Sequence, residues 1–593
     1  MRYKNRGEVP EKYKWDLTDF FKSDKEFNDE IINVKSMIPN INKYKGCTKD
    51  NKKLLSYLDE TIKIETILEK LYIYSYLNND VELGNSKWIN NKNIIEDLMN
   101  EYNVANSFFN PELLKLNEKE YNNLFLNGDL LKYKALLDNI YRYKGHVLSS
   151  FEEEIISRLE NSTNIFEDAS STMLNKEHNY GSVKIGNQKE IITPTNLRSL
   201  LKNEDVKIRK KVYQKYNNEL GEYGDTSAAF LNGYVKLNNE VSKIHNFKSA
   251  WDEKLFSLQL TEQCYDALKE TVLDNVDVLQ KYLDVFKDTL GLKKLHLYDL
   301  NLDIANNKTK YSIEEAQDLT LKAVKVLGKE YYELFNNIFK NRYIDYACYK
   351  GKCSGGYSFK PSELPSRILM SYNDDLESIS TIIHEGGHNV HGEFLSANND
   401  VIYREVSTLL SEVASLTNEC LLSYYLINNG SKEEQISGIS NLINVVISNL
   451  FGSVREGIIE QEFNNYVLDG NTLTKEYLNK LTLDSLKKFY GNKVLLDESN
   501  SYSWMRRSHY FMNYYLFNYA FCISVALYVS KSILDNKDNM LDKYLEFLKI
   551  GSDVTPMEAF KVLGIDLEDK KVYQQAIDNF NELIDELVKR KEV

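Results

Sequence analysis

Proline and long apolar runs are scarce in this chain of 593 residues, and what is missing excludes several kinds of protein. Only seven prolines occur, and long stretches without proline or glycine favour long helices. The most apolar run, residues 516–529, is too short to cross a bilayer and is interrupted by Asn518 and Ser524. We therefore expect a buried helix there and no contact with a membrane.

Cysteines are few, and the acidic residues outnumber the basic ones. The six cysteines are unevenly spaced and form no Cys-x-x-Cys pair, which is typical of reduced thiols in a cytosol. Residues 1–4 lead into charged sequence that does not resemble a signal peptide, so we expect a cytoplasmic protein. The net charge of −14, with lysine and arginine scattered along the chain, argues against nucleic-acid binding through phosphates.

The apolar residues recur mainly at helical spacing, so the predicted fold class is mainly α. This spacing predicts helices in segments 49–105, 111–140, 197–246, 260–290, 404–429, 432–468, 509–534 and 538–590. Strand signals are few. Residues 180–192 favour a small hairpin around Gly186-Asn187, and residues 343–372 favour two or three short strands. No glycine- and serine-rich linker and no repeat divides the chain.

The motif that carries most chemical information is His384-Glu385-Gly386-Gly387-His388. Histidines four apart on a helix project from one face, where both can bind the same zinc ion. The glutamate beside the first histidine can act as general base for a metal-activated water. Asn373-Asp374-Asp375 is a good helix N-cap cluster just upstream, so we predict a helix through the motif.

Gly386 and Gly387 are unusual inside a helix, because each costs about 1 kcal/mol there. Two adjacent glycines predict that something large, another helix or a substrate, approaches the backbone closely. Upstream of the motif, residues 367–372 are predicted to form a short strand. An extended segment beside a zinc helix is a natural edge for pairing a peptide substrate.

Spacing alone leaves the third zinc ligand open. Phe394 stands where the long HExxHxxGxxH motif has its third histidine, which excludes that class of zinc peptidase. The predicted helix after the motif carries Glu405, Glu412 and Glu419, each seven residues apart and therefore on one face. Each of the three is a candidate ligand, and a glutamate that does not bind the metal can orient a ligating histidine.

His391 is a fourth residue to consider as the third zinc ligand, after the three glutamates. It follows His388 by three residues and so lies on the same stripe of the predicted helix. This position fits a group behind a ligand, or a histidine packed in the core, better than a metal ligand.

Five stretches, in order along the chain, match motifs of one known family. They are residues 10–19, 351–357, 368–372 together with 380–391, 412–415 together with 418–419, and 504–510. The sequence Gly351-Lys352-Cys353-Ser354-Gly355-Gly356-Tyr357 is similar to a Lys-Arg-x-Gly-Ala-Tyr loop, and Trp504-Met505-Arg506-Arg507-Ser508-His509-Tyr510 is similar to Trp-x-Arg-Ile-Pro-His-Phe. The chain thus resembles oligoendopeptidase F, the bacterial branch of the thimet-oligopeptidase-like zinc peptidases.

The resemblance implies a metal centre and a base. It makes His384, His388 and Glu412 the ligands of one zinc ion per chain. It makes Glu385 the catalytic general base. Two imidazoles and one carboxylate leave the fourth position of a tetrahedral zinc open for water.

The resemblance also implies groups that bind substrate and steady the transition state, namely His509 and a tyrosine on the helix after it. Tyr514, Tyr515 and Tyr519 all fall within that stretch. We favour Tyr515 and Tyr519, which are four apart and share a face with His509 at roughly helical spacing. The remaining predicted substrate-binding residues lie in the middle loop and at the end of the predicted strand: Gly355, Gly356, Tyr357 and Tyr372.

For the whole chain, the resemblance implies one large helical body with two lobes that enclose a deep channel. We divide it into an N-terminal helical region, residues 1–195, and a catalytic domain, residues 196–593. The expected activity is that of a zinc-dependent oligoendopeptidase, which hydrolyses internal bonds of short unstructured peptides. No oligomeric state is predicted.

Two other functions stay open. A dipeptidyl carboxypeptidase or metallocarboxypeptidase on the same scaffold would trim C-termini, and it would need a cation to hold the terminal carboxylate. Arg506, Arg507 and Lys352 are candidates for that cation. A non-enzymatic peptide-binding protein is the other alternative, and the intact metal ligands together with Glu385 argue against it.

Overall fold

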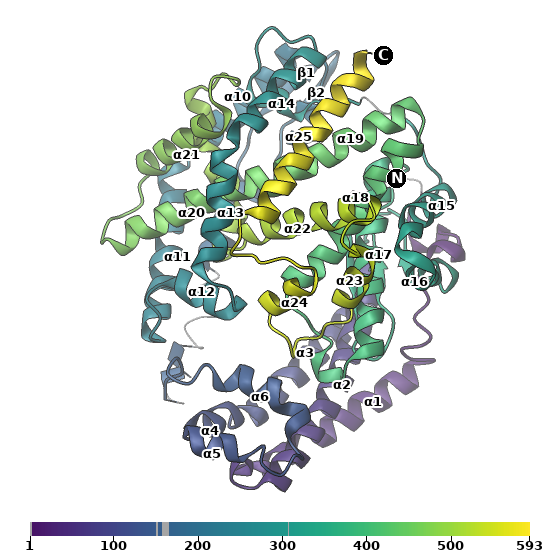
Figure 1. Cartoon of the computed structure of the whole chain (residues 1–593), viewed down its shortest axis with the longest axis vertical. Coiled ribbons are helices and arrows are strands. Elements are labelled where there is room, and N and C mark those ends of the chain that lie inside the picture. The colour runs from purple at the N-terminus through teal and green to yellow at the C-terminus, as the bar shows by residue number, and fades with distance from the viewer. Residues whose placement is uncertain (1–2, 150–151, 154, 157–164, 306–307, 593) are drawn as a thin grey trace. The chain divides into compact units, whose positions relative to one another are not determined.

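The computed structural model of this chain is built almost entirely of helices (Figure 1). It describes residues 3–149, 152–153, 155–156, 165–305 and 308–592. The chain forms two compact units, each assembled from three separate stretches. The first unit comprises Met1–Ser150, Lys308–Leu422 and Val529–Gly564, and the second comprises Phe151–Asn307, Ser423–Tyr528 and Ile565–Val593.

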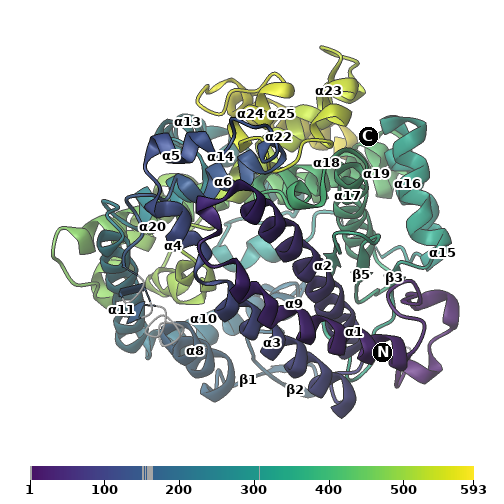
Figure 2. The same ribbon diagram turned by 90° about the horizontal axis from the view of Figure 1, so that it is seen from below.

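The first unit holds the longest helix and a small sheet. Its helices are α1 (Asp24–Met37), α2 (Asn51–Val81), α3 (Ser86–Asn106), α4 (Phe109–Lys115), α5 (Glu118–Asn123), α6 (Lys134–Tyr141), α15 (Ile313–Val324), α16 (Gly328–Lys340), α17 (Leu376–Asn398), α23 (Met540–Phe547) and α24 (Pro556–Val562). Asp50 caps α2 by accepting from the backbone N–H groups of Lys52 and Lys53. Helices α2 and α3 pack along each other (Figure 2).

In its described residues, the second unit is built of helices and one hairpin. Its helices are α8 (Ile165–Ser171), α9 (Leu197–Leu201), α10 (Val206–Gly221), α11 (Gly224–Ile244), α12 (Ala250–Leu258), α13 (Glu262–Asp274), α14 (Val276–Thr289), α19 (Lys432–Val446), α20 (Ser453–Leu468), α21 (Lys475–Tyr490) and α25 (Lys571–Glu592). The hairpin is the predicted one, β1 (Ser182–Ile185) and β2 (Gln188–Ile191), turning at Gly186-Asn187.

The compact units do not coincide with a division of the chain between residues 195 and 196. Two unit boundaries fall inside helices, α18 (Thr408–Asn429) and α22 (Phe517–Leu534), where no linker composition marks them. The mainly helical fold class is confirmed, and the predicted channel between lobes stays a prediction.

The sheet of the first unit corrects one expectation about substrate pairing. Its strands are β3 (Ile344–Asp345), β4 (Tyr357–Phe359) and β5 (Arg367–Leu369), in the order β3-β5-β4. Strand β5 is parallel to β3 on one side and antiparallel to β4 on the other. It is therefore the central strand, and its backbone is already paired on both sides. The two outer strands, β3 and β4, each keep one edge that pairs with no other strand of the described residues.

The predicted helix over residues 509–534 is wrong in its first third. His509 belongs to the short 3-10 helix η12 (Ser508–Phe511), and α22 begins only at Phe517. Asn513 and Tyr514 have φ angles of 41° and 53°, which lie in the left-handed region and end any α-helix. Glu460 of α20 stabilises this turn, because its Oε1 accepts a hydrogen bond from the Tyr514 backbone N–H at 2.7 Å.

Among the residues that the structure describes, two helical stretches have the length and hydropathy of membrane-spanning segments. They are Lys432–Leu468, in which a π-helical turn (Ile447–Gly452) joins α19 to α20, and α22. Within the structure, 61% and 78% of their most apolar windows are buried, as is usual for the core helices of a folded protein. The predicted burial of residues 516–529 agrees with this, and the absence of membrane contact stays a prediction.

Candidate metal centre and substrate cavity

Helix α17 displays the two motif histidines on one face. Asp375 caps it by accepting from the Ser378 backbone N–H at 2.9 Å, as the N-cap cluster predicted. Buried apolar residues such as Ile379, Ile382 and Ile383 hold the opposite side of the helix in the core. The imidazole rings of His384 and His388 then lie with their centroids 5.0 Å apart.

The paired glycines allow two neighbouring helices to approach α17 closely, as predicted. A Cβ atom on Gly386 would lie 2.5 Å from the Phe335 ring of α16, and one on Gly387 would lie 2.8 Å from the Ser415 Cα of α18. Asn418 of α18 bridges the gap by donating to the Ile383 carbonyl at 3.2 Å. Glycine at position 387 thus allows the backbone of α18 to lie directly against α17.

This approach places Glu412 opposite both histidines. Its Oε2 lies 3.6 Å from His384 Nε2 and 3.9 Å from His388 Nε2. Ligand atoms of all three residues lie within 4.8 Å of one another. Two imidazole nitrogens and a carboxylate oxygen are the donor set of a catalytic zinc site, so these residues fit the predicted ion.

Glu419 has a different task on the same helix. Its Oε1 lies 2.6 Å from His384 Nδ1, and its Oε2 accepts from the Ser380 hydroxyl at 3.0 Å. A carboxylate on Nδ1 keeps a proton there and leaves Nε2 as the ligand nitrogen. Burial lowers the pKa of His384, but the hydrogen bond and charge of Glu419 outweigh it and raise that pKa to about 9.

Glu405, the remaining candidate, is not on this helix. α18 begins at Thr408, so Glu405 lies in the preceding loop, where it is exposed. The seven-residue spacing therefore does not place it on the face of Glu412 and Glu419. His391 is 2% exposed, and its Nε2 has no hydrogen-bond partner in the described part of the chain. Burial lowers its pKa to about 4, as expected of a neutral core histidine.

Glu385 lies beside the ligands and is 8% exposed. Burial raises its pKa to about 7, against the opposing effect of His384. Its Oε1 lies 3.7 Å from the position that a Cβ on Gly356 would take. The glycine loop before β4 therefore passes next to this carboxylate, which connects the predicted base to the predicted substrate-binding loop.

A cavity of about 820 Å³ opens beside the metal ligands within the first unit. Ser358 and Phe359 of β4 line it together with His388 and Glu412. Gly355 and Gly356 precede this strand and are exposed, and Gly355 has φ +94°, a conformation that favours glycine. A free strand edge thus lies along the same cavity as the candidate ligands.

The two predicted tyrosines of this region are bonded within the first unit. Tyr357 donates its hydroxyl hydrogen bond to Asp80 Oδ2 at 2.8 Å. Tyr372 is 9% exposed and donates to the carbonyls of Tyr311 and Ser312, while its backbone N–H donates to the carbonyl of Tyr346. These contacts give Tyr372 a structural role within the first unit, and its predicted contact with substrate stays a prediction.

In the second unit, His509, Tyr515 and Tyr519 form a cluster of rings. Ring centroids lie 6.1 Å apart for His509 and each tyrosine, and 5.4 Å apart for the two tyrosines. They meet because the chain turns at residues 513–514, and not because they share one helix face. Their roles toward substrate stay predictions.

Sequence reasoning missed the buried polar residues that hold α17 in position. Tyr331 of α16 donates to Asn418 Oδ1 at 3.0 Å, and Asn389 of α17 donates to the Ser366 carbonyl at 3.1 Å. Asn418 and Asn389 are almost fully buried. The only signal was an uncharged polar side chain inside an apolar stripe, which has many possible causes.

Comparison with known proteins identifies the family of this chain. The model of peptidase family M3 matches residues 199–579, and that of oligopeptidase F matches residues 112–178. The chain belongs to peptidase family M3. Oligopeptidase PepF of Bacillus subtilis (strain 168) is 31% identical over 98% of this chain and 88% of its own length. The M3 chain described here is therefore a peptidase.

Further relatives and solved structures extend over nearly the whole M3 chain. Group B oligopeptidase PepB of Streptococcus agalactiae serotype III (strain NEM316) is 29% identical, covering 98% of each chain. A crystal structure of a putative peptidase from Chlamydophila abortus superposes with a TM-score of 0.91 at 27% identity, covering 99% of this chain and 100% of its own. Oligoendopeptidase-F from Enterococcus faecium, at 23% identity, shares the fold with a TM-score of 0.74, covering 96% and 99% of the two chains.

Proposed function

We propose that this chain is a zinc-dependent endopeptidase that hydrolyses internal bonds of short, unstructured peptides. The observation that carries the proposal is the convergence of His384, His388 and Glu412, with Glu419 behind the first histidine. Bound by these residues, zinc supplies a Lewis acid that polarises the peptide carbonyl and lowers the pKa of water toward 7.

Glu385 is proposed as the general base. It accepts a proton at its carboxylate from the attacking water and donates that proton to the leaving amine. Burial raises its pKa to about 7, where the carboxyl group can both accept and release a proton near neutral pH. The glycine backbone at Gly356 allows a substrate to reach this carboxylate without a side chain in between.

The free edge of β4 is proposed to align the substrate. An extended peptide can add to a strand edge through backbone hydrogen bonds, which are independent of its sequence. Strand β4 is one of the two edge strands, and it contributes to the cavity that also contains His388 and Glu412. This arrangement supports a preference for peptides that are already unfolded, because only they present a free backbone.

The names of the relatives, oligopeptidase and oligoendopeptidase F, agree with a substrate of limited length. We also propose a cytoplasmic location, supported by six cysteines that are all free thiols. No nucleic-acid or membrane partner is part of the proposal.

The exopeptidase alternative loses one of its three candidate cations. The Lys352 side chain is 1% exposed and donates to Asp345 Oδ1 at 2.7 Å and to three backbone carbonyls. It cannot hold a substrate carboxylate while these bonds persist. Arg506 and Arg507 remain.

The test is the Glu385→Gln variant. We expect it to keep stoichiometric zinc and peptide affinity while kcat falls by at least about a hundredfold, the usual scale for a general base. Zinc is measured by elemental analysis and turnover with a quenched fluorescent peptide. Glu377→Gln changes an exposed carboxylate on the same helix and serves as the control. Near-normal turnover in the zinc-loaded Glu385→Gln variant would remove Glu385 from the mechanism.

A further inference from the structure

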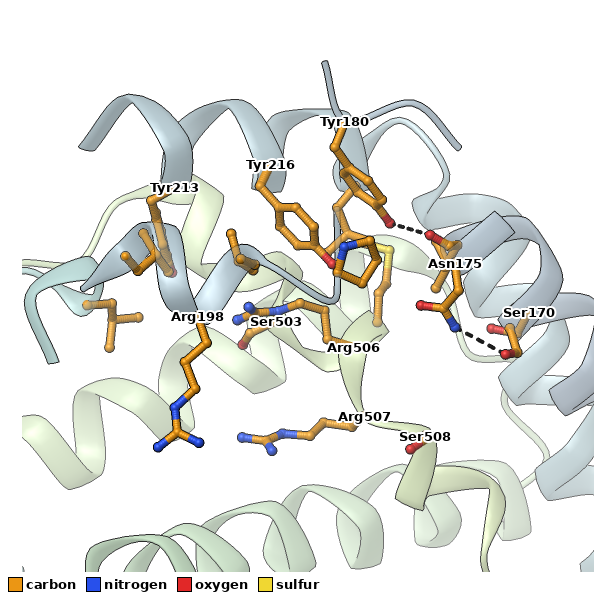
Figure 3. Close-up of a pocket in the computed structure, with 18 of the residues that line it drawn as sticks. Ser170, Asn175, Tyr180, Arg198, Tyr213, Tyr216, Ser503, Arg506, Arg507 and Ser508 are labelled. Carbon is orange, nitrogen blue, oxygen red and sulfur yellow. Dashed lines mark hydrogen bonds between the residues drawn. The ribbon is translucent and has the colours of Figure 1, made fainter. Parts of the chain in front are cut away.

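A second cavity, of about 480 Å³, lies wholly within the second unit and is strongly cationic (Figure 3). Among the charged side chains that line it are four arginines, Arg198, Arg455, Arg506 and Arg507, against Glu167. The chain as a whole carries a net charge of −14. This local excess of positive charge is therefore opposite in sign to the rest of the protein.

One buried carboxylate already serves two of these arginines. Glu456 Oε1 accepts from Arg455 at 2.5 Å and lies 3.2 Å from Arg507 Nη2. Arg455 also donates to the Tyr490 hydroxyl at 2.8 Å. Arg455 is buried with these partners, whereas the Arg507 side chain remains 42% exposed. Arg507 can therefore donate to a further acceptor at the cavity.

Arg198 and Arg506 have no ion pair or hydrogen bond with any residue that the structure describes, and both are exposed. The Arg506 guanidinium lies 5.8 Å from the centroid of the Tyr216 ring, which itself stacks on Tyr180 at 4.2 Å. Figure 3 shows Arg198 and Arg507 extending toward the same part of the cavity. An aromatic wall orients Arg506, since a guanidinium packs well against aromatic faces.

The cationic cavity borders the segment where substrate contacts were predicted. Arg455, Arg507 and Tyr490 also line a neighbouring cavity of about 430 Å³ that includes His509 and Tyr519. Ser508, adjacent to His509, lines the cationic cavity itself. A peptide in contact with His509 would thus lie close to Arg507, which lines both cavities, and beside the cavity that contains Arg198 and Arg506.

We propose that the Arg198–Arg506–Arg507 cavity binds a carboxylate group of the peptide substrate. Guanidinium groups form paired, charge-assisted hydrogen bonds with carboxylates, and no residue that the structure describes occupies the donors of Arg198 and Arg506. The carboxylate comes either from an acidic side chain or from the peptide C-terminus. This inference rests on the proposed peptidase function and adds a substrate preference to it.

The experiment compares one fluorescent nonapeptide in three forms: with two aspartates and a free C-terminus, with the same aspartates and a C-terminal amide, and with asparagines and an amide. In the Arg198→Gln variant, kcat/KM should fall at least about tenfold more for a peptide that carries the carboxylate bound by the cavity than for the asparagine amide, which carries none. The fall should come mainly through KM. If kcat/KM falls selectively for the aspartate amide, the bound carboxylate is that of an aspartate side chain. If it falls selectively only for the peptide with a free C-terminus, the bound carboxylate is the C-terminal one.

Lys202→Gln removes an exposed cation four residues after Arg198 and is the matched control. Arg506→Gln is the second variant, and Arg198→Lys should recover only part of the preference because lysine cannot bond bidentately. Equal losses on all three peptides, or none, would overturn the proposal and return these arginines to ordinary solvated positions.

Binding separates this inference from the proposed function. Fluorescence anisotropy of the same peptides on the Glu385→Gln protein, with and without Arg198→Gln, reports carboxylate binding without turnover. If the wild-type protein cleaves no peptide, the proposed function fails. The cavity assignment then stands or falls on whether the Arg198→Gln change weakens binding of the acidic peptides selectively.

Discussion

Glu412 and Glu419 show how two identical residues on one helix acquire different roles. They are seven residues apart on α18, so both face α17. Glu412 reaches the Nε2 atoms of both histidines, whereas Glu419 reaches Nδ1 of His384. The first position suits a metal ligand, and the second suits a group that fixes the orientation and tautomer of a ligand.

This division predicts graded effects on metal content. Glu412→Ala should lose most zinc, because it removes a ligand. Glu419→Ala should weaken zinc affinity by about 10–100-fold and keep the site otherwise intact. Glu405→Ala should bind zinc as the wild type does, since Glu405 lies in the preceding loop. Zinc affinity is measured by competition with a chelator, and stoichiometric tight zinc in Glu412→Ala would show that the third ligand is misassigned.

Glu460 provides a second test at the residue scale, on pH-dependent stability. It is 2% exposed, and burial raises its pKa from 4.5 to about 8, against the opposing effects of the Tyr514 N–H and Lys254. The folded state therefore holds a proton that the unfolded state releases. The Glu460 carboxyl group therefore makes its full contribution to the free energy of unfolding below about pH 4.5. That free energy falls by about 1.4 kcal/mol per pH unit as the pH rises toward 8.

Glu460→Gln should remove this dependence, because glutamine keeps the Oε1 acceptor for the Tyr514 N–H and carries no charge. We expect the variant to melt at a higher temperature than the wild type at pH 8 and at the same temperature near pH 4.5. Glu462→Gln, an exposed position on the same helix, is the control. A difference in melting temperature that is constant between these pH values contradicts a buried, protonated Glu460.

At the residue scale, the metal centre could be predicted largely from sequence. The spacing in His384-Glu385-Gly386-Gly387-His388 predicts two candidate ligands and a candidate base, because a helix puts residues four apart on one face. Spacing left three glutamates open, and the family resemblance selected Glu412. Only the start of α18 at Thr408 separates Glu405 from the other two, and helix ends depend on packing that sequence patterns record poorly.

At the scale of elements, the contact between α17 and α18 brings the residues of the candidate metal centre together. Gly387 lies against the Ser415 backbone, one turn from Glu412, and next to His388 in the chain. Any side chain at position 387 must push the two helices apart, because backbone atoms cannot move aside as a flexible side chain can. The glycine pair thus costs helix propensity and provides the geometry of the donor set.

Gly387→Ala is therefore expected to destabilise the protein by about 1–3 kcal/mol, the usual cost of overpacking. It should also weaken zinc binding by separating His388 from Glu412. Chemical denaturation and chelator competition measure the two effects. Gly457→Ala in α20 is the control, because its Cβ would meet only the Tyr265 ring at ordinary contact distances. Wild-type zinc affinity in Gly387→Ala would show that helix spacing does not control the site.

Elements were predicted well where a pattern is local and poorly where it depends on partners. The hairpin at Gly186-Asn187 and the helix after Asp375 follow from turn and cap chemistry within a few residues. The edge assignment of residues 367–372 failed because strand order is a property of three segments together. The break at residues 513–514 was missed because a distant glutamate, Glu460, stabilises it.

For the whole molecule, the division into units could not be predicted from the sequence. Each compact unit gathers three distant stretches, and the chain contains no linker composition at the boundaries within α18 and α22. The helical class was predictable because apolar periodicity is summed over hundreds of residues. Membership of peptidase family M3 adds the class of activity, peptide hydrolysis, to this predicted fold class.

The most direct test of the central claim is mass spectrometry of the products formed from a mixed peptide pool by the zinc-loaded, the zinc-stripped and the zinc-restored protein. The pool holds one cleavable sequence at increasing length, free and inside a folded protein. We predict internal cleavage of the short unstructured peptides, no cleavage after zinc removal, recovery on restoring zinc, and an intact folded protein. Undiminished cleavage without zinc, or products that are only C-terminal dipeptides, would contradict the account.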